Sequence, residues 1–354
     1  MIEFAVLGSG SSGNSAVVCY GETRILVDAG LSARQLKVRL EEIGVDPDSL
    51  TAIVLTHEHG DHVQGLEVFC RKRPLPVYAT VHTSHIVQQD KIKKAQISWR
   101  KFEAGSCFTV GDIEIDSFNV PHDAVDPVGF VFRSPGGSLG ILSDVGHVTR
   151  LIIERLKGVD SLFVESNYDD IMLQNDEKRP WSLKQRISNR HGHLSNKQTA
   201  ELLKEVATAD LNRVILGHLS SDCNTAEKAL EFARGALGEI GLTDVEVECA
   251  ERKSPTPLYP ALKGVAIQPR TPLDEDIAKA VAAVEANLDK SDEKPAEAVF
   301  IEAKGVNENR EVDPIYPTLP EKSTLKLKEA TTFVDDEICE PVVDPDLVQM
   351  ELAL

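Results

Sequence analysis

Short apolar runs alternate with amphipathic stretches along the first 260 residues. Runs such as Ala52-Ile53-Val54-Leu55 and Ser161-Leu162-Phe163-Val164 have the length and composition of buried strands. Strands are predicted over 2–7, 15–20, 24–28, 52–55, 76–79, 107–110, 112–119, 128–133, 139–143, 161–164, 214–216 and 245–249. Strands broken by helices, in two halves, predict an α/β fold in which helices cover both outer faces of two sheets, an αββα four-layer sandwich.

Capping residues followed by apolar stripes indicate the helices. Ser32 precedes a stripe of Leu36, Leu40 and Ile43. Ser195 with Gln198 fits a capping box, and Asn224 with Glu227 predicts another capped helix. Two further helices are expected, one through 63–69 and one that follows His147 and ends near Leu156.

The folded pattern is expected to end around Pro255-Thr256-Pro257. Residues 1–260 are interpreted as one domain and residues 261–354 as an acidic C-terminal extension. The extension contains a helix-like stretch at 277–288, strand-like runs at 298–301 and 325–328, and clusters of Pro, Glu and Asp. This composition predicts disorder with short transient elements, and a small accessory module is the alternative.

The net charge of −19 is spread unevenly. Residues 261–354 contain 21 acidic and 10 basic side chains, a net −11, which leaves −8 for the first 260 residues. This balance argues against a surface built throughout to hold nucleic acid, so phosphate contacts need local Lys and Arg. Basic clusters at 71–73 and 91–94 are typical of solvated helix faces, whereas Arg179, Lys184, Arg186 and Arg190 gather just before His193.

Cysteine usage and the apolar runs indicate a cytoplasmic protein. The six cysteines show no CxxC or other paired spacing, so reduced thiols are expected. The N-terminus lacks the basic start of a signal peptide and is predicted to be a strand. No apolar run approaches the roughly 20 residues that span a bilayer, so no membrane contact is expected.

The segment Thr56–His62, with the sequence THEHGDH, carries the strongest chemical signal. It follows a predicted strand, and in an extended chain alternate side chains point the same way, so His57, His59 and Asp61 can face one point with His62 beside them. Imidazole nitrogen and carboxylate oxygen are ligands that zinc accepts. The alternative is a chance polar turn.

Three more predicted strands end in residues that can bind a metal. His122 follows the strand at 112–119, Asp144 the strand at 139–143, and His218 the strand at 214–216. Taken alone, each residue is more simply a satisfied polar group at a strand end. Together with Thr56–His62 they predict a metal centre where strands end.

The order HxHxDH, then His, Asp and His, resembles that of the metallo-β-lactamase-fold hydrolases. The resemblance covers the first 260 residues and implies a first metal on His57, His59 and His122 and a second on Asp61, His62 and His218, with Asp144 bridging. It also implies that Asp28, in the sequence Leu26-Val27-Asp28-Ala29-Gly30, orients ligands without binding the metal.

A pair of divalent ions explains why such residues would gather. Two ions share a water, lower its pKa and present hydroxide as the nucleophile, and Asp61 is expected to take part in this catalysis. Their charge favours an anionic substrate despite the acidic total. Zn²⁺ is the first choice of ion and Mn²⁺ the alternative, because histidine and carboxylate suit both.

The segment Arg190–Ala200 resembles the motif that carries the phosphate-contacting histidine of the family's phosphodiesterases, such as RNase Z. That histidine corresponds to His193, and the glutamate that orients it corresponds to Glu165. A carboxylate stabilises imidazolium, which suits a general acid. The alternative for His193 is a polar residue ahead of a helix N-terminus.

The set of motifs is most similar to the bacterial YycJ/WalJ-type branch, which resembles 5′-to-3′ exonucleases. Only 74 positions separate Asp144 from His218, too few for the inserted domain of RNase J-like enzymes. The acidic extension and Gly60, where serine is more usual, depart from this branch.

Four further residues are predicted to contact substrate. Ser12 and Asn14 belong to the glycine-rich loop Gly8–Asn14, which either borders the active site or forms a tight hairpin. Arg190 adjoins His193, and Asn167 follows Glu165 closely.

The leading hypothesis is a two-metal phosphodiesterase acting on nucleic acid, DNA rather than RNA, from an end. One alternative is a hydrolase of a small substrate, either a cyclic phosphodiester or an ester or thioester. Another is a non-catalytic regulatory module whose acidic extension recruits a protein partner; the complete ligand set speaks against it.

Overall fold

Two seven-stranded sheets form the centre of residues 1–261, the part of the chain that the computed structural model describes. The first sheet contains, from edge to edge, β14 Tyr259–Ala261, β1 Ile2–Gly8, β2 Ser15–Tyr20, β3 Thr23–Val27, β4 Ala52–Val54, β5 Pro76–Thr80 and β6 Ser98–Phe102. The second contains β13 Glu246–Cys249, β12 Arg213–Gly217, β11 Ser161–Glu165, β10 Gly137–Leu142, β9 Val128–Ser134, β8 Ile113–Asn119 and β7 Cys107–Val110.

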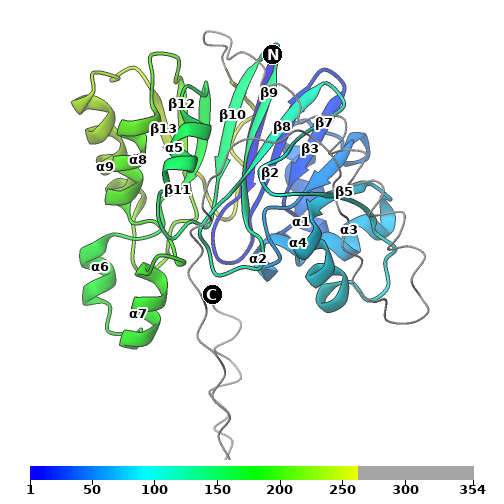
Figure 1. Cartoon of the computed structure of the whole chain (residues 1–354), viewed down its shortest axis with the longest axis horizontal. Coiled ribbons are helices and arrows are strands. Elements are labelled where there is room, and N and C mark those ends of the chain that lie inside the picture. Colours follow the sequence, from blue (N-terminus) through cyan, green and yellow to red (C-terminus); the bar gives the residue numbers. More distant parts are fainter. Residues whose placement is uncertain (262–354) are drawn as a thin grey trace, which may run out of the picture. The chain divides into compact units, whose positions relative to one another are not determined.

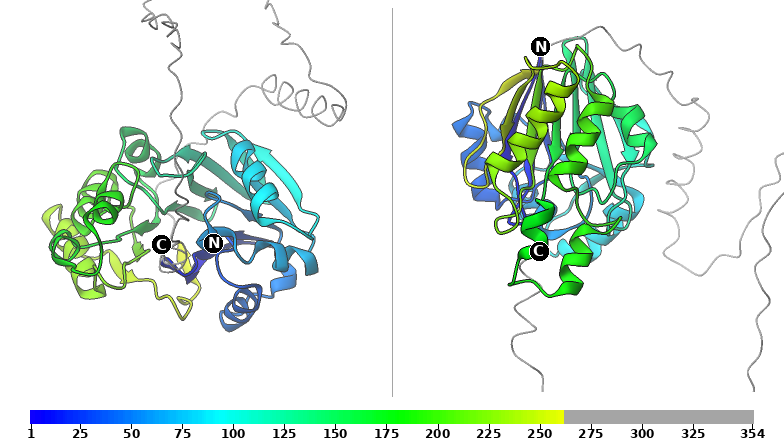
Figure 2. Two further views of the ribbon diagram at one scale, coloured as in Figure 1. Left: turned by 90° about the horizontal axis from the view of Figure 1, so that it is seen from below. Right: turned by 90° about the vertical axis from the view of Figure 1, so that its left-hand side faces the viewer.

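Helices lie on the outer sides of both sheets, as Figures 1 and 2 show. They are α1 Ala33–Glu42, α2 Gly60–Val63, α3 Leu66–Lys72, α4 Val81–Ile86, α5 Arg150–Leu156, α6 Asp170–Asn175, α7 Trp181–Ser188, α8 Asn196–Val206 and α9 Ala226–Glu239, with short turns of helix at Pro47–Ser49 and Val87–Lys91. The predicted αββα sandwich is confirmed.

Each sheet is antiparallel in one part and parallel in the other. Strands β1 to β3 form antiparallel neighbours, whereas β3 to β6 run parallel. Likewise β7 to β10 are antiparallel and β10 to β13 are parallel. Parallel strands need crossover connections, which the helices supply, and their carboxyl ends meet at one edge of the sheet.

Three apolar clusters hold the four layers together. The inner cluster joins the sheets and includes Phe4 and Ile25 from the first and Phe130 and Phe132 from the second. A second cluster packs Leu36 of α1 against the first sheet. A third packs α5, α8 and α9 on the second sheet through Ile152, Leu203 and Ala233. The helix stripes seen in the sequence are the faces that cover the sheets.

The capping box of α8 forms as predicted, at Ser195 with Gln198, and the predicted cap of α1, Ser32, also forms a capping box, with Gln35. The predicted cap of α9 was wrong. Thr225 is the N-cap and accepts from the Lys228 amide, whereas the Asn224 side-chain oxygen accepts from the Asn196 side-chain amide at 2.8 Å and from the Thr225 backbone amide at 2.9 Å.

The helix expected through 63–69 is two helices, α2 and α3. They separate near Gly65, whose amide donates to the Ala29 carbonyl at 2.9 Å. A Cβ atom on Gly65 would lie 1.9 Å from the Leu31 carbonyl oxygen. The chain breaks its helix here because the backbone passes too close to the loop after β3.

Two strands, β6 and β14, and three helices, α4, α6 and α7, were missing from the prediction. Edge strand β6 is mostly exposed and polar, so it has no apolar run. Strand β14 pairs with β1, so the folded pattern continues beyond Pro257 to Ala261. Helices α6 and α7 follow β11 and bury few side chains. The helix-like stretch at 277–288 and the runs at 298–301 and 325–328 lie outside the described residues.

Within residues 1–261, every helix falls short of the length and apolar character that a membrane crossing requires.

Candidate active site

The predicted site residues come from loops at the carboxyl ends of strands. Asp28 follows β3 directly, and the segment Thr56–His62 follows β4. Asp144 follows β10, and His218 follows β12 directly. Because β3 is parallel to β4, and β10 to β12 are parallel, these loops meet at one edge of each sheet. The tertiary structure therefore brings together residues nearly 200 positions apart in the chain.

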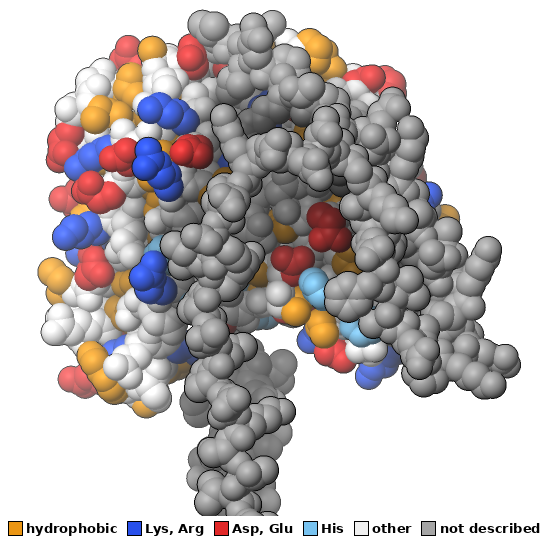
Figure 3. All heavy atoms as spheres, in the orientation of Figure 1, with side chains coloured by type: hydrophobic (Ala, Val, Ile, Leu, Met, Phe, Trp, Pro, Cys, Tyr) orange, Lys and Arg blue, Asp and Glu red, His pale blue; other side chains and the backbone are white. Residues whose placement is uncertain are grey.

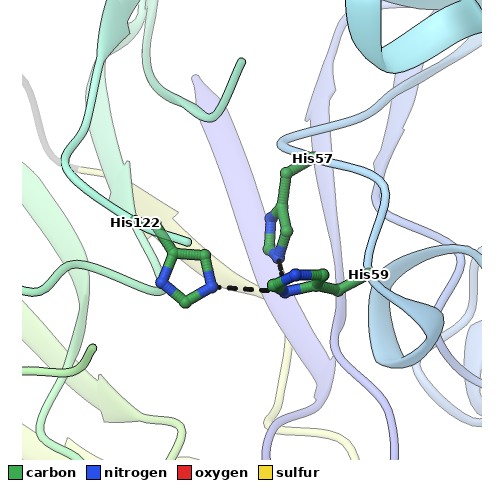
Figure 4. Close-up of side chains that lie close together, drawn as sticks. All are labelled: His57, His59 and His122. Carbon is green, nitrogen blue, oxygen red and sulfur yellow. Dashed lines mark hydrogen bonds between the residues drawn. The ribbon is translucent and has the colours of Figure 1, made fainter. Parts of the chain in front are cut away.

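Three histidine side chains point toward one another, as Figure 4 shows. His57 Nε2 lies 3.0 Å from His59 Nδ1, and His122 Nε2 lies 3.2 Å from the same His59 nitrogen. Two imidazole nitrogens at this distance can share only one proton. The three rings therefore cannot meet the full hydrogen-bonding capacity of these nitrogens among themselves. A divalent cation would accept all three lone pairs, so this donor set fits a metal ion.

Asp144 lies at the centre of the second group of ligand atoms. One of its oxygens, Oδ2, is 2.9 Å from His62 Nε2, and the other, Oδ1, is 2.8 Å from His218 Nδ1. Asp61 Oδ2 lies 3.6 Å from His62 Nε2 and 3.9 Å from His218 Nε2. Asp144 thus lies between His62 and His218. Asp61 lies farther from both rings and, within residues 1–261, is absent from the groups of ligand-type atoms that lie within 4.8 Å of one another.

Asp28 contacts the His62 ring at Nδ1, the nitrogen opposite the one that faces Asp144. The Asp28 Oδ2 atom is 2.7 Å from His62 Nδ1 and accepts from the Thr56 hydroxyl at 2.8 Å, while Oδ1 accepts from the Thr56 amide. The ring of His62 is fully buried, and its Nε2 faces Asp144. This geometry is compatible with an orienting role for Asp28, and the role itself stays a prediction.

Three of the predicted site residues have a left-handed backbone conformation. Among residues 1–261, the non-glycine residues with positive φ are Asp28, Asp144 and His218, at 58°, 54° and 53°. Such a conformation costs about 1–3 kcal/mol at each position and persists only where the surroundings hold it. Each residue lies just after a strand, so the strain turns these side chains toward the site.

His193 and Glu165 contact each other beside these groups. His193 Nδ1 lies 2.7 Å from Glu165 Oε1, and Glu165 Oε2 accepts from the amides of Val145 and Leu194. Glu165 is fully buried, whereas the His193 side chain is 22 % exposed. Glu165 Oε1 is also 3.1 Å from His218 Nδ1, so the pair adjoins the ligand group.

The local charges set the protonation of these side chains. Burial would raise the pKa of the Glu165 carboxyl, but the neighbouring imidazoles of His193 and His218 lower it to about 2. Burial would lower the pKa of His193, but the Glu165 carboxylate outweighs burial and raises it. Burial lowers the pKa of His57 and of His122, which favours the neutral imidazole that binds metals.

The predicted substrate contacts differ in their surroundings. The Asn14 amide lies 2.9 Å from Asp61 Oδ2 and 3.1 Å from His62 Nε2, so the glycine-rich loop borders the site. The Asn167 amide donates to the His218 carbonyl at 2.8 Å. Both asparagines are buried and engaged with other site residues. Arg190 is exposed and contacts His147, and Ser12 is exposed and accepts a hydrogen bond through its carbonyl from Gln64.

Sequence reasoning missed several residues that hold the site. Thr56 binds Asp28, Ser9 accepts from the His218 amide at 2.7 Å, and Thr199 donates to the Glu165 carbonyl at 2.7 Å. Thr56 begins the segment Thr56–His62, and Ser9 lies in the glycine-rich loop Gly8–Asn14. Their position beside predicted site residues was therefore the available signal. Thr199 lies in the helix after His193, and the sequence does not indicate which way its hydroxyl points.

Comparison with known proteins identifies the family. Residues 23–219 match a Beta-lactamase superfamily domain. The chain is 35 % identical over 262 residues to exodeoxyribonuclease YycJ of Bacillus anthracis, covering 72 % of this chain and 97 % of that one. It is 38 % identical over 263 residues to exodeoxyribonuclease WalJ of Streptococcus pneumoniae serotype 2 (strain D39 / NCTC 7466), with the same coverage of both chains.

The fold has a solved counterpart in the metallo-β-lactamase fold protein YhfI from Bacillus subtilis. The TM-score is 0.55 at 17 % identity, over 72 % of this chain and 99 % of that one. The family implies bound divalent metal, and the donor groups described above fit it. The chain therefore belongs to the β-lactamase superfamily, as a metal-dependent hydrolase with the metallo-β-lactamase fold.

Proposed function

We propose that this protein is a dinuclear-metal phosphodiesterase, an exonuclease that removes nucleotides from the 5′ end of DNA. The observation that carries the proposal is the 2.7 Å contact between His193 and Glu165 at the edge of the metal-binding group. A hydrolase of esters or lactams has no need of such an acid pair. The relatives YycJ and WalJ are named exodeoxyribonucleases, which supports DNA as the substrate.

The chain's own residues suit two ions, with Zn²⁺ the first choice and Mn²⁺ the alternative. His57, His59 and His122 would hold one ion, and Asp61, His62 and His218 the other. Asp144 would touch both, because its ligand atoms lie within 4.8 Å of those of His57 and His62 in one group and of His218 in another. Bound there, the ions would supply Lewis acidity and an activated water for attack on phosphorus. Asn14 and Asn167 would keep Asp61 and His218 in position through the hydrogen bonds described above.

His193 is suited to act as the general acid. Its Nδ1 is engaged by Glu165, so its Nε2 remains to face a substrate oxygen. The Glu165 carboxylate raises the pKa of His193, which favours the imidazolium, and protonation of the departing oxygen is what cleavage of a diester requires. The exposed Arg190 and Ser12 remain the proposed contacts to the substrate.

The deciding experiment incubates metal-loaded protein with end-labelled single- and double-stranded DNA and RNA. A chromogenic phosphodiester and a chromogenic ester run beside them. His193→Ala should lower phosphodiester cleavage by about 10²–10⁴-fold, the usual contribution of a general acid. His191→Ala, an exposed neighbour, is the matched control. Undiminished DNA cleavage in His193→Ala would refute the assignment, and ester cleavage without DNA cleavage would favour the small-substrate hydrolase.

Three further proposals concern the location of the protein, its division into domains and a protein partner. The cysteines Cys19, Cys70, Cys107, Cys223 and Cys249 are free thiols, which supports a reducing, cytoplasmic location. Residues 1–260 would be the catalytic domain and 261–354 an acidic extension. The net charge of that extension suits contact with a basic protein partner.

A further inference from the structure

Helix α7 carries an exposed tryptophan on a basic segment that leads into the active site. Trp181, the first residue of α7, is 67 % exposed. Residues 178–191 contain five Lys or Arg and no Asp or Glu, in a chain whose net charge is −19. In the space-filling view of Figure 3, basic and acidic side chains are interspersed over the uncovered part of the visible face. An exposed aromatic ring among cations is a combination that proteins use to hold nucleic acid.

The carboxyl end of α7 is fastened to the site. The His193 amide donates to the Ile187 carbonyl at 2.8 Å, and His122 Nδ1 lies 3.1 Å from the Gly192 carbonyl oxygen. Trp181 lies six residues before Ile187, which is about 9 Å along a helix axis. A stacked strand advances about 3.4 Å per nucleotide, so the length of α7 from Trp181 to Ile187, whose carbonyl binds the His193 amide, equals about three nucleotides.

The segment before Trp181 is held in place by ion pairs. Arg179 Nη1 lies 2.6 Å from Asp176 Oδ2, and its Nη2 lies 2.9 Å from Asp222 Oδ2. The Tyr168–Leu173–Cys223 cluster packs the inner side of α6 and α7, which project together from one end of the domain in Figures 1 and 2. Trp181 takes no part in that cluster, so packing gives no reason for its position.

Two cations on the same segment have no carboxylate partner within residues 1–261. Lys184 Nζ donates to the Gln174 carbonyl, and Arg190 Nη2 contacts His147 Nε2 at 3.1 Å. Arg186, by contrast, pairs with Asp123. Lys184 and Arg190 therefore keep charge that a phosphate can use, and they lie between Trp181 and His193 in the chain.

We propose that Trp181 stacks on an unpaired base of the substrate about three nucleotides from the cleaved bond, while Lys184 and Arg190 contact the intervening phosphates. The inference rests on the proposed function and deepens it, because it names a single strand as the bound form. Each base in a duplex is already stacked on its neighbours, whereas an unpaired base offers its face to an aromatic ring.

The chain has two tryptophans, so the contact can be observed directly. In Trp99→Phe, Trp181 is the sole tryptophan, and a phosphorothioate oligothymidine that resists cleavage should quench its fluorescence. Trp181→Ala should weaken binding of a strand of about twelve nucleotides by about five- to 150-fold, the effect of losing one stacked base. Trp181→Phe should retain most of the affinity. A trinucleotide is too short to reach Trp181, so its affinity should be the same for Trp181→Ala and for the unaltered protein.

Each failure has a distinct meaning. Absence of quenching overturns this inference, and so does equal affinity of Trp181→Ala and the unaltered protein for the long strand. If the protein still cleaves DNA in either case, the proposed function stands. Equal quenching by duplex DNA overturns the assignment to single strands. Absence of any nucleic-acid cleavage by the unaltered protein refutes the proposed function instead.

Discussion

The Oδ2 atom of Asp28 lies 2.7 Å from Nδ1 of His62 and directs the opposite ring nitrogen toward Asp144. Asp28→Asn should lower metal affinity by about 10–100-fold, as loss of a charged orienting partner usually does. Asparagine tolerates the positive φ of this position, so the effect will not come from the backbone. Metal titration followed by calorimetry measures it. Asp112→Asn, in an exposed turn, should bind normally, and unchanged affinity in Asp28→Asn would show that Asp28 is dispensable.

Metal should stabilise the fold through Asp144. A ligand present at about 100 times its dissociation constant stabilises the native state by about 2.7 kcal/mol, so adding Zn²⁺ to chelator-stripped protein should raise the melting temperature. Asp144→Asn removes the charge shared by His62 and His218 and should lose most of this shift together with cleavage. Thermal melts with and without metal test it; an equal shift in the variant contradicts the central role of Asp144.

Gly30 should not tolerate a side chain. A Cβ atom there would lie 1.6 Å from the Asp61 carbonyl oxygen, so Gly30→Ala should cost about 1–3 kcal/mol or more in unfolding free energy and displace Asp61. Gly60→Ala is the matched control, because within residues 1–261 its Cβ would meet nothing within 4 Å. Gly60 is the first residue of α2, so Gly60→Ala should leave the free energy of unfolding unchanged or slightly higher. Chemical denaturation compares the two, and similar stabilities would contradict this packing.

Thr199 should matter to both stability and catalysis. Its hydroxyl donates to the Glu165 carbonyl at 2.7 Å and lies 3.1 Å from the Ser195 carbonyl oxygen. Thr199→Val keeps the shape but leaves a buried carbonyl short of a donor, which costs about 1–3 kcal/mol. Activity should fall with it, because Glu165 orients His193. Thr109→Val, on the exposed side of β7, should leave both quantities within the error of urea unfolding and of the cleavage assay.

The features that could be predicted from the sequence are those encoded by residues close together in the chain. The motif Thr56–His62 places several ligands within a few residues, and the capping boxes at Ser32 and Ser195 depend only on near neighbours. The pairing of Glu165 with His193 came from resemblance to a family motif, and the structure brings the two side chains into contact. Edge strand β6 and helices α6 and α7 gave weak signals because they bury little apolar surface.

The sequence by itself determined the fold class and the chemical identity of the site, since apolar periodicity and clustered histidines are properties of short segments. Only the tertiary structure decided that Asn14 reaches Asp61, that Ser9 holds the His218 amide, and that Asp28, Asp144 and His218 share a strained backbone. These relationships join segments up to 209 positions apart. Their distances depend on how two sheets pack and on the direction in which each strand ends, which no short stretch of chain encodes.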